Sequence, residues 1–199
     1  MKPVVIFDVD KTFITSDLPD YLYRQRIFKR KIRAKDIFYA AFFFIMFHCT
    51  RWKARRRFEY WYEGFIDSER VCEIVESHEL VNESVRRRFL KYLKLGYDIY
   101  FVTAAPRAIA IRLSSLYDVQ VKASKTFRGF IINDLMGCKE NKVYSEISKN
   151  ATIVAIYSDS KPDHSTLARY NYIVRDSGIY LDREKRVNRN YCSVTTVNV

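Results

Sequence analysis

Apolar runs that end in polar residues recur along the chain and predict buried strands. Residues 4–7 read Val-Val-Ile-Phe, and a half-buried strand would instead alternate with polar residues. Similar runs occupy residues 99–102 and 153–157, and residues 172–174 are expected to be the last strand. Two shorter strands are expected at residues 119–121 and 127–132. Continuous apolar runs of this kind are typical of a parallel sheet covered on both faces.

Helical patterns fill the intervals between these strands. Helices are expected at residues 68–76, with Asp67 or Ser68 as the N-terminal cap, and at residues 82–95, ended by Gly96. Another follows Pro106 and Arg107 and runs towards Leu116, and a last one carries Lys142 at its start. Alternating strands and helices predict an α/β fold.

Residues 17–96 differ in composition and are predicted to form a helical cap inserted after the first strand. Residues 21–35 are strongly basic without any acidic residue, residues 37–49 are apolar, and residues 51–57 are basic again. An apolar run of about 10–14 residues is too short to span a bilayer but suits an interfacial helix on anionic lipid. The alternative is a core helix of the cap. The absence of a polar face within residues 37–49 favours membrane contact.

Composition sets the outer limits. A chain of 199 residues that is 48% hydrophobic can bury one sizeable core and a small accessory domain. The four cysteines form no Cys-x-x-Cys pair, which is untypical of a zinc site or a disulfide framework and indicates a reducing compartment. No secretory signal pattern is present, so a cytoplasmic location is expected, with peripheral contact at the inner face of the membrane. The net charge of +12 predicts an anionic partner.

Two carboxylates follow the first strand directly. Asp8 and Asp10 are spaced i, i+2 and are expected to point into the crevice at the carboxyl ends of the strands, where open α/β sheets bind ligands. Like charges this close should hold a cation or raise the pKa of one group. The alternative is that both are turn residues that cap the next helix, which Asp commonly does.

Three later segments weigh against that alternative. Residues 8–12 read Asp-Val-Asp-Lys-Thr, and in chain order there follow a strand ending at Thr103, a lysine at a helix start, Lys142, and a strand followed by Asp-Ser-Lys-Pro-Asp at residues 159–163. This series resembles the four motifs of the haloacid dehalogenase superfamily, whose phosphatases work through an aspartyl phosphate. The resemblance implies a Rossmann-like catalytic core at residues 1–16 and 97–185, with residues 186–199 as a tail.

The resemblance also implies a role for each motif residue. Asp8 would attack phosphorus and Asp10 would act as the general acid and base, with Thr12 ordering the loop or contacting substrate. Thr103, the backbone of Ala104 and Lys142 would bind the phosphoryl group. Mg²⁺ would be held by Asp8, the backbone carbonyl of Asp10 and Asp159, with Asp163 in a supporting position.

The position of the insertion resembles the phosphoserine-phosphatase-like branch. The basic and apolar insert, together with the cysteine before the motif lysine, is similar to enzymes of the phosphatidylglycerophosphatase C type. Two positions depart from the superfamily pattern. Lys11 stands where Gly is usual, which puts an extra positive charge beside the nucleophile, and Ser158 stands where Gly commonly precedes the metal-binding Asp.

Three functions follow as alternatives. The favoured one is a Mg²⁺-dependent phosphatase of a lipid phosphate at the membrane surface. The second is the same chemistry on a soluble phosphorylated metabolite. The third is a weakly catalytic basic module that binds membrane or nucleic acid, and nucleic acid is the less favoured partner. The sequence indicates neither the leaving group nor the oligomeric state.

Overall fold

The computed structural model describes residues 1–18, 79–127, 130–176 and 178–182, together with scattered positions between 21 and 77. Most of the predicted cap, including all but four positions of residues 37–49, lies outside the described residues, as does the tail. Within the described part of the chain, no helix is both long and apolar enough to cross a membrane.

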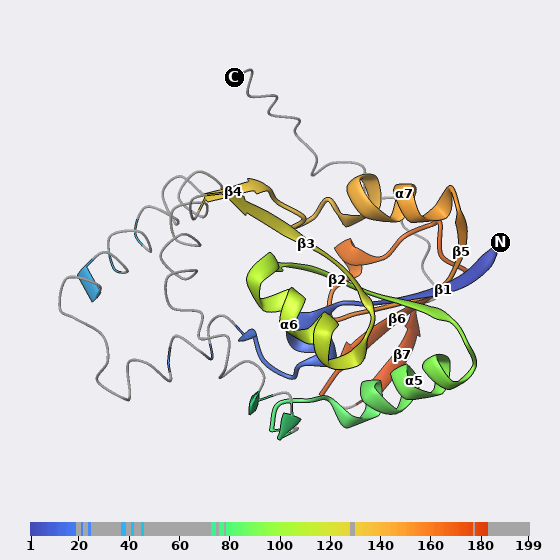
Figure 1. Ribbon diagram of the computed structural model, residues 1–199, viewed down its shortest axis with the longest axis horizontal. Coiled ribbons are helices and arrows are strands. Elements are labelled where there is room, and N and C mark those ends of the chain that lie inside the picture. Colours follow the sequence, from blue (N-terminus) through green and yellow to red (C-terminus); the bar gives the residue numbers. More distant parts are fainter. Residues whose placement is uncertain are drawn as a thin grey trace, which may run out of the picture.

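The described residues form a seven-stranded sheet in the order β4-β3-β2-β1-β5-β6-β7 (Figure 1). The five strands from β3 to β6 in that order are parallel, and β4 and β7 are added antiparallel at the two edges. The prediction of an α/β fold with a mostly parallel Rossmann-like sheet is therefore confirmed. The strands are β1 (Lys2–Phe7), β2 (Asp98–Pro106), β3 (Gln120–Phe127), β4 (Phe130–Asn133), β5 (Ala151–Ser158), β6 (Tyr170–Arg175) and β7 (Gly178–Asp182).

Both edges of the sheet differ from the prediction. The strand expected at residues 119–121 extends to Phe127, and the strand expected at residues 127–132 is divided, because β3 and β4 pair as an antiparallel hairpin. Residues 172–174 are also not in the last strand, since β7 follows and pairs with β6. The strand β3 contains many polar residues, and the apolar runs of β4 and β7 are only three residues long, so these edge segments lack the longer run that marks β1 and β5.

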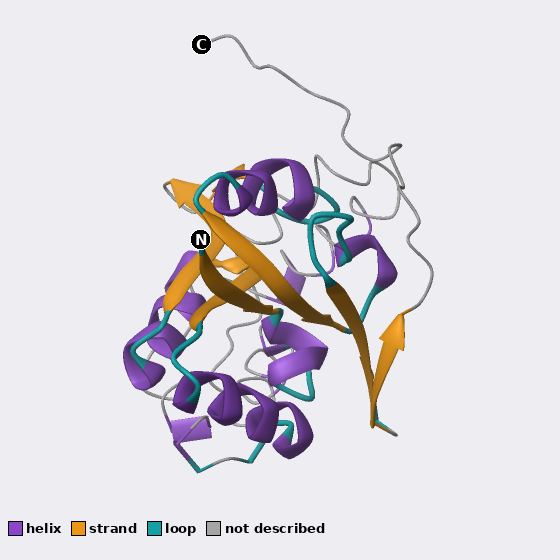
Figure 2. Cartoon of the chain, turned by 90° about the vertical axis from the view of Figure 1, so that its right-hand side faces the viewer, coloured by secondary structure: helices purple, strands orange, loops and turns teal. Residues whose placement is uncertain are grey.

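Helices cover both faces of the sheet (Figure 2). On one face, α5 (Glu83–Lys94) packs against β2, and α6 (Arg107–Tyr117) packs against β2 and β3. On the other face, η2 (Glu140–Tyr144) leads directly into α7 (Ser145–Ser148), and α7 packs against β5. The sheet is thus the middle of three layers.

The helix at residues 82–95 forms as its sequence predicts. Asn82 caps it, with its Oδ1 accepting a hydrogen bond from the Val85 N–H at 3.3 Å, and Gly96 follows with a φ of 75°. The predicted domain division placed this helix in the cap. However, Val85 and Phe89 are fully buried in the hydrophobic core on one face of the sheet, so the helix packs as part of that core.

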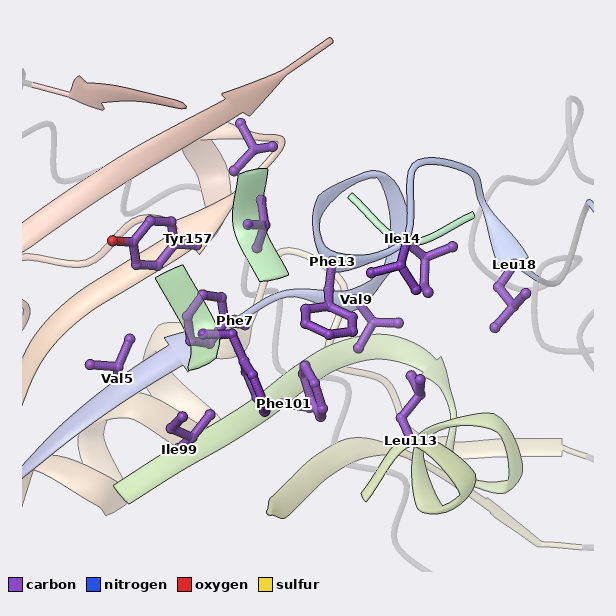
Figure 3. Packing of buried hydrophobic residues seen from close by; sticks show 14 of the residues in the cluster. Val5, Phe7, Val9, Phe13, Ile14, Leu18, Ile99, Phe101, Leu113 and Tyr157 are labelled. Atoms are coloured by element: carbon purple, nitrogen blue, oxygen red, sulfur yellow. The ribbon is translucent and has the colours of Figure 1, made fainter. Parts of the chain in front are cut away.

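The larger of the two cores lies on the α5 and α6 face and is rich in aromatic residues (Figure 3). Phe7 stacks on Tyr157 with ring centroids 4.8 Å apart, and Phe13 meets Phe101 edge to face at 4.9 Å. Burial of a large side chain contributes about 1.5–3 kcal/mol. Because Phe7 and Tyr157 directly precede the polar ends of β1 and β5, this packing supports the chain where the predicted site begins.

Candidate active site

The carboxyl ends of β1, β2 and β5 bring the predicted motifs together. In the register of the sheet, Phe7 pairs with Phe101 on one side and with Tyr157 on the other. Asp8, Thr103 and Asp159 lie one or two residues beyond these partners. The strand order reverses at β1, and such a reversal is where open α/β sheets bind ligands.

A wide turn, η1 (Val9–Phe13), follows Asp8 and shapes the site. It is closed by two backbone hydrogen bonds, from the Phe13 N–H to the Asp8 carbonyl at 3.3 Å and from the Ile14 N–H to the Val9 carbonyl at 2.9 Å. Lys11 in the middle of this turn adopts φ 55° and ψ 12°, a left-handed conformation that favours glycine. Lys11, which stands where Gly is usual in the superfamily, therefore carries a side chain at a position where the backbone requires a positive φ.

Lys139 lies between two buried carboxylates. Its Nζ is 2.8 Å from Oδ1 of Asp8 and 2.7 Å from Oδ2 of Asp163, and the lysine side chain is only 2% exposed. Burial acts to lower the pKa of Lys139, but the attraction of Asp8 and Asp163 outweighs it and raises the pKa. Lys139 is therefore a permanent cation inside the site.

The structure places Lys139 in the position that the sequence prediction gave to Lys142. Nζ of Lys142 instead donates to Oδ1 of Asn133 at 2.9 Å and to the Asp134 carbonyl at 2.8 Å, in an exposed position. The physical reason is helical periodicity. Lys139 lies four and eight residues before the buried Val143 and Ile147 and shares their inward face, whereas Lys142 does not.

The carboxylate of Asp10 is held by two donors. The Leu18 N–H donates to its Oδ1 at 2.9 Å, and the Thr103 hydroxyl donates to its Oδ2 at 3.4 Å. Oγ1 of Thr103 in turn accepts the Ala105 N–H at 3.0 Å. Burial and the nearby charge of Asp17 raise the pKa of Asp10 to about 8. A carboxyl group with such a pKa can hold a proton near neutral pH and donate it to an acceptor.

Three acidic side chains converge beside Lys139. Carboxylate oxygens of Asp8, Asp159 and Asp163 all lie within 4.8 Å of one another. Burial raises the pKa of Asp8 to about 7, with a further contribution from Asp163. The pKa of Asp159 is raised by burial and then by Asp163, and Lys139 and Lys11 act against this shift. Crowded oxygen ligands of this kind fit a hard divalent cation such as Mg²⁺.

Asp163 takes part in the site directly, whereas the sequence prediction gave it a supporting position. Its Oδ2 accepts hydrogen bonds from the hydroxyls of Ser158 at 3.2 Å and Ser160 at 3.3 Å, in addition to the Lys139 ammonium. The Ser158 hydroxyl is thus a contact that the sequence analysis missed. On the other side of the loop, Arg175 donates to the Asp159 carbonyl at 2.8 Å. These bonds fix the loop that carries both acidic residues.

Two other predicted residues have different surroundings. Thr12 is fully buried, and among the residues that the structure describes its Oγ1 has no hydrogen-bond partner, so its hydroxyl is not presented to a substrate. The Ala104 carbonyl accepts the buried Ser124 hydroxyl at 2.8 Å, and the same hydroxyl accepts the Leu135 N–H at 3.1 Å. Ser124 thus braces the backbone directly after Thr103, which is a second role that the sequence analysis missed.

Comparisons with known proteins agree with this fold. A protein of unknown function from Bordetella pertussis Tohama I has a TM-score of 0.59 at 15% identity, and the match covers 82% of this chain and 84% of that one. Phosphoserine phosphatase in its apo form has a TM-score of 0.51 at 13% identity, covering 86% of this chain and 85% of that one. At such identities these likenesses concern the fold.

No curated protein matches the sequence. The model of the haloacid dehalogenase-like hydrolases matches residues 5–168, and the chain belongs to this family.

Proposed function

We propose that the protein is a Mg²⁺-dependent phosphomonoester hydrolase in which Asp8 forms an aspartyl phosphate. The observation that carries the proposal is the pairing of Asp8 with Lys139 at 2.8 Å, at the end of β1, beside the hydrogen-bonded Asp10. A nucleophilic carboxylate needs a nearby cation, because it must approach an anionic phosphoryl group. Lys139 supplies that positive charge from a buried position beside Asp8.

The chemistry has two steps. In the first, an oxygen of Asp8 bonds to phosphorus while the bond from phosphorus to the leaving oxygen breaks, and Asp10 gives its proton to that oxygen. In the second, Asp10 takes a proton from water as the water oxygen bonds to phosphorus, which releases phosphate and restores Asp8. A pKa of about 8 suits Asp10 to both proton transfers.

Asp8, Asp159 and Asp163 would hold the Mg²⁺ ion, with the backbone carbonyl of Asp10 as a further oxygen ligand. When bound, the ion would offset the repulsion between these carboxylates and an incoming phosphate. The remaining positioning is done by the chain itself. Ser158 and Ser160 orient Asp163, and Thr103 orients Asp10.

Phosphate release from p-nitrophenyl phosphate, with and without Mg²⁺, tests this proposal. The wild type should hydrolyse the ester only with Mg²⁺, and Asp8→Asn should lose the activity. Asp98→Asn is the matched control, because Asp98 is a carboxylate that pairs with Lys2 away from the site. Hydrolysis by Asp8→Asn at the wild-type rate would contradict the proposal.

A lipid phosphate is the substrate class that we favour, with a soluble phosphorylated metabolite as the alternative. Ile37, Phe38 and Ile45 are 51%, 70% and 61% exposed, and they belong to an apolar stretch between two basic ones. Exposed apolar side chains flanked by cations suit the surface of an anionic bilayer.

Vesicle binding separates these two substrates. Replacing Ile37, Phe38 and Ile45 together by Ser should weaken binding to anionic vesicles and lower activity on a vesicle-borne phosphomonoester, while hydrolysis of p-nitrophenyl phosphate persists. Unchanged vesicle binding would exclude the lipid surface as the role of these residues. Persistent vesicle or nucleic-acid binding by a wild type without any turnover would favour the non-catalytic alternative.

A further inference from the structure

Lys11 occupies a position that a simple turn would give to glycine. Its φ of 55° places an L-amino acid in the left-handed region, at a cost of about 1–2 kcal/mol. The turn that contains it is closed by backbone hydrogen bonds, including one from the Lys11 N–H to the Ser16 carbonyl at 3.2 Å. None of these bonds needs the lysine side chain. Strained residues of this kind are concentrated at functional sites.

The ammonium of Lys11 differs from that of Lys139 in its surroundings. Lys139 is buried and already pairs with Asp8 and Asp163. Lys11 is exposed, and among the described residues its side chain has no ion pair or hydrogen bond. Lys11 directly follows Asp10 in the turn at the carboxyl end of β1, and its positive charge lowers the pKa of Asp159. Among the described residues, Lys139 is therefore neutralised by two carboxylates, whereas the charge of Lys11 is not.

The burial of each lysine side chain indicates which part of a substrate it can contact. The phosphoryl group must reach Asp8, which is 7% exposed, so this group lies in the inner part of the site. The remainder of the substrate then lies further out, where Lys11 is exposed to solvent. An unpaired ammonium at this level would attract a second negative group.

We propose that Lys11 is a specificity residue that binds a second anionic group, outside the phosphoryl group, on the leaving portion of the substrate. This inference rests on the proposed phosphatase function. It predicts a preference for phosphomonoesters that carry a further carboxylate or phosphate near the ester over neutral esters of the same size. A carboxylate and a phosphate both present anionic oxygens that one ammonium group can bind.

Calorimetric binding of two phosphonates that are not hydrolysed tests the role of Lys11. Propylphosphonate and 3-phosphonopropionate have the same chain length and differ by a terminal methyl or carboxylate group. At low salt and fixed free Mg²⁺, the wild type should bind 3-phosphonopropionate about fivefold more tightly, as expected for a partly exposed ion pair. The preference should shrink as the salt concentration rises.

Three variants separate the charge of Lys11 from its backbone conformation. Asn and Gly both tolerate a positive φ, so Lys11→Asn and Lys11→Gly should bind the two phosphonates equally. Lys11→Arg keeps the charge and should keep the preference. Retention of the preference in Lys11→Asn, or its absence in the wild type, would overturn the assignment. Equal weakening of both ligands in Lys11→Asn would also overturn it, because Lys11 would then serve the phosphoryl group.

Different results would overturn the phosphatase function and the role of Lys11. A wild type that hydrolyses p-nitrophenyl phosphate but shows no preference between the phosphonates overturns the role of Lys11 alone. A wild type that neither hydrolyses the ester nor binds either phosphonate overturns the phosphatase function, and the role of Lys11 with it. Alkaline phosphatase, as a positive control for the ester assay, distinguishes an inactive protein from an inactive assay.

Discussion

The ammonium nitrogen of Lys139 lies 2.8 Å from Oδ1 of Asp8, and both side chains are more than nine-tenths buried. The same nitrogen reaches Asp163 from a second loop, at 2.7 Å. Lys139 therefore joins the N-terminal cap of η2 to the ends of β1 and β5. A single buried cation thus connects three segments that are distant in the sequence.

Replacement of Lys139 by Met should be damaging to both stability and activity. It leaves two buried carboxylates without their cation, which typically costs about 3–5 kcal/mol of unfolding free energy. We also expect a loss of at least about 100-fold in kcat for p-nitrophenyl phosphate. Urea unfolding and steady-state kinetics measure the two effects.

Lys142→Met is the matched control for Lys139→Met. Lys142 is exposed and donates to Asn133 and Asp134, so its loss should cost no more than about 1 kcal/mol and should leave kcat nearly unchanged. A greater loss of activity in Lys142→Met than in Lys139→Met would contradict the placement of Lys139 in the site.

The raised pKa of Asp10 predicts a fall in stability with rising pH. Burial raises the pKa from 3.8 to about 8, so between these values the folded state holds a proton that the unfolded state has lost. The free energy of unfolding, measured without Mg²⁺, should therefore decrease as the pH rises through this interval. Asp10→Asn should make the decrease smaller, although the raised pKa of Asp8 preserves part of it.

Asp17→Asn provides a milder form of the same experiment. The charge of Asp17 contributes to the raised pKa of Asp10, so its removal should move the upper end of the pH interval to lower pH. A stability curve that is identical in the wild type and Asp10→Asn would show that Asp10 does not carry this proton.

The hydroxyl of Thr103 should matter more than its methyl group. Thr103→Val removes the donor to Asp10 and leaves the Ala105 N–H without its acceptor, which costs about 1–3 kcal/mol when a buried group loses its partner. The variant should also lower kcat, because Asp10 is no longer oriented. Thr103→Ser keeps the hydroxyl and should restore most of both losses. Equal behaviour of Val and Ser in unfolding and kinetics would contradict this role.

Lys11→Gly should stabilise the fold. It removes a left-handed strain of about 1–2 kcal/mol, from which about 0.5–1 kcal/mol of added backbone entropy in the unfolded chain must be subtracted. The net gain measured by urea unfolding should therefore lie between about 0 and 1.5 kcal/mol. Asp118 also has a positive φ, 49°, but lies directly after α6. Asp118→Gly should thus be stabilising without a change in kcat, and destabilisation by Lys11→Gly would argue against strain at this position.

Most of the sheet and much of the site could be predicted from the sequence. Central strands of a parallel sheet are apolar on both faces, so their ends are easily recognised, and residues that follow those ends meet at one edge. Asp8, Asp10 and Thr103 belong to this class, and the structure brings them together. Residues held by hydrogen bonds across the fold, such as Ser124 beneath Ala104, leave no comparable pattern in the sequence.

Two of the differences between prediction and structure have clear physical causes. Lys139 and Lys142 lie on the same short helical segment, and motif order alone does not distinguish them, whereas the spacing to Val143 and Ile147 does. The edge strand β7 has an apolar run of only three residues, of which Tyr180 and Leu181 are exposed, so it is shorter than the run expected of a buried strand.

Identification of the residue that carries the phosphoryl group tests the central claim most directly. Enzyme quenched with acid during turnover of p-nitrophenyl phosphate is treated with borohydride, which reduces an aspartyl phosphate to homoserine, and the peptides are then sequenced by mass spectrometry. Homoserine is expected at position 8 in the wild type and not at that position in Asp8→Asn. Homoserine at another aspartate, or undiminished turnover by Asp8→Asn, would contradict the assignment of Asp8 as the nucleophile.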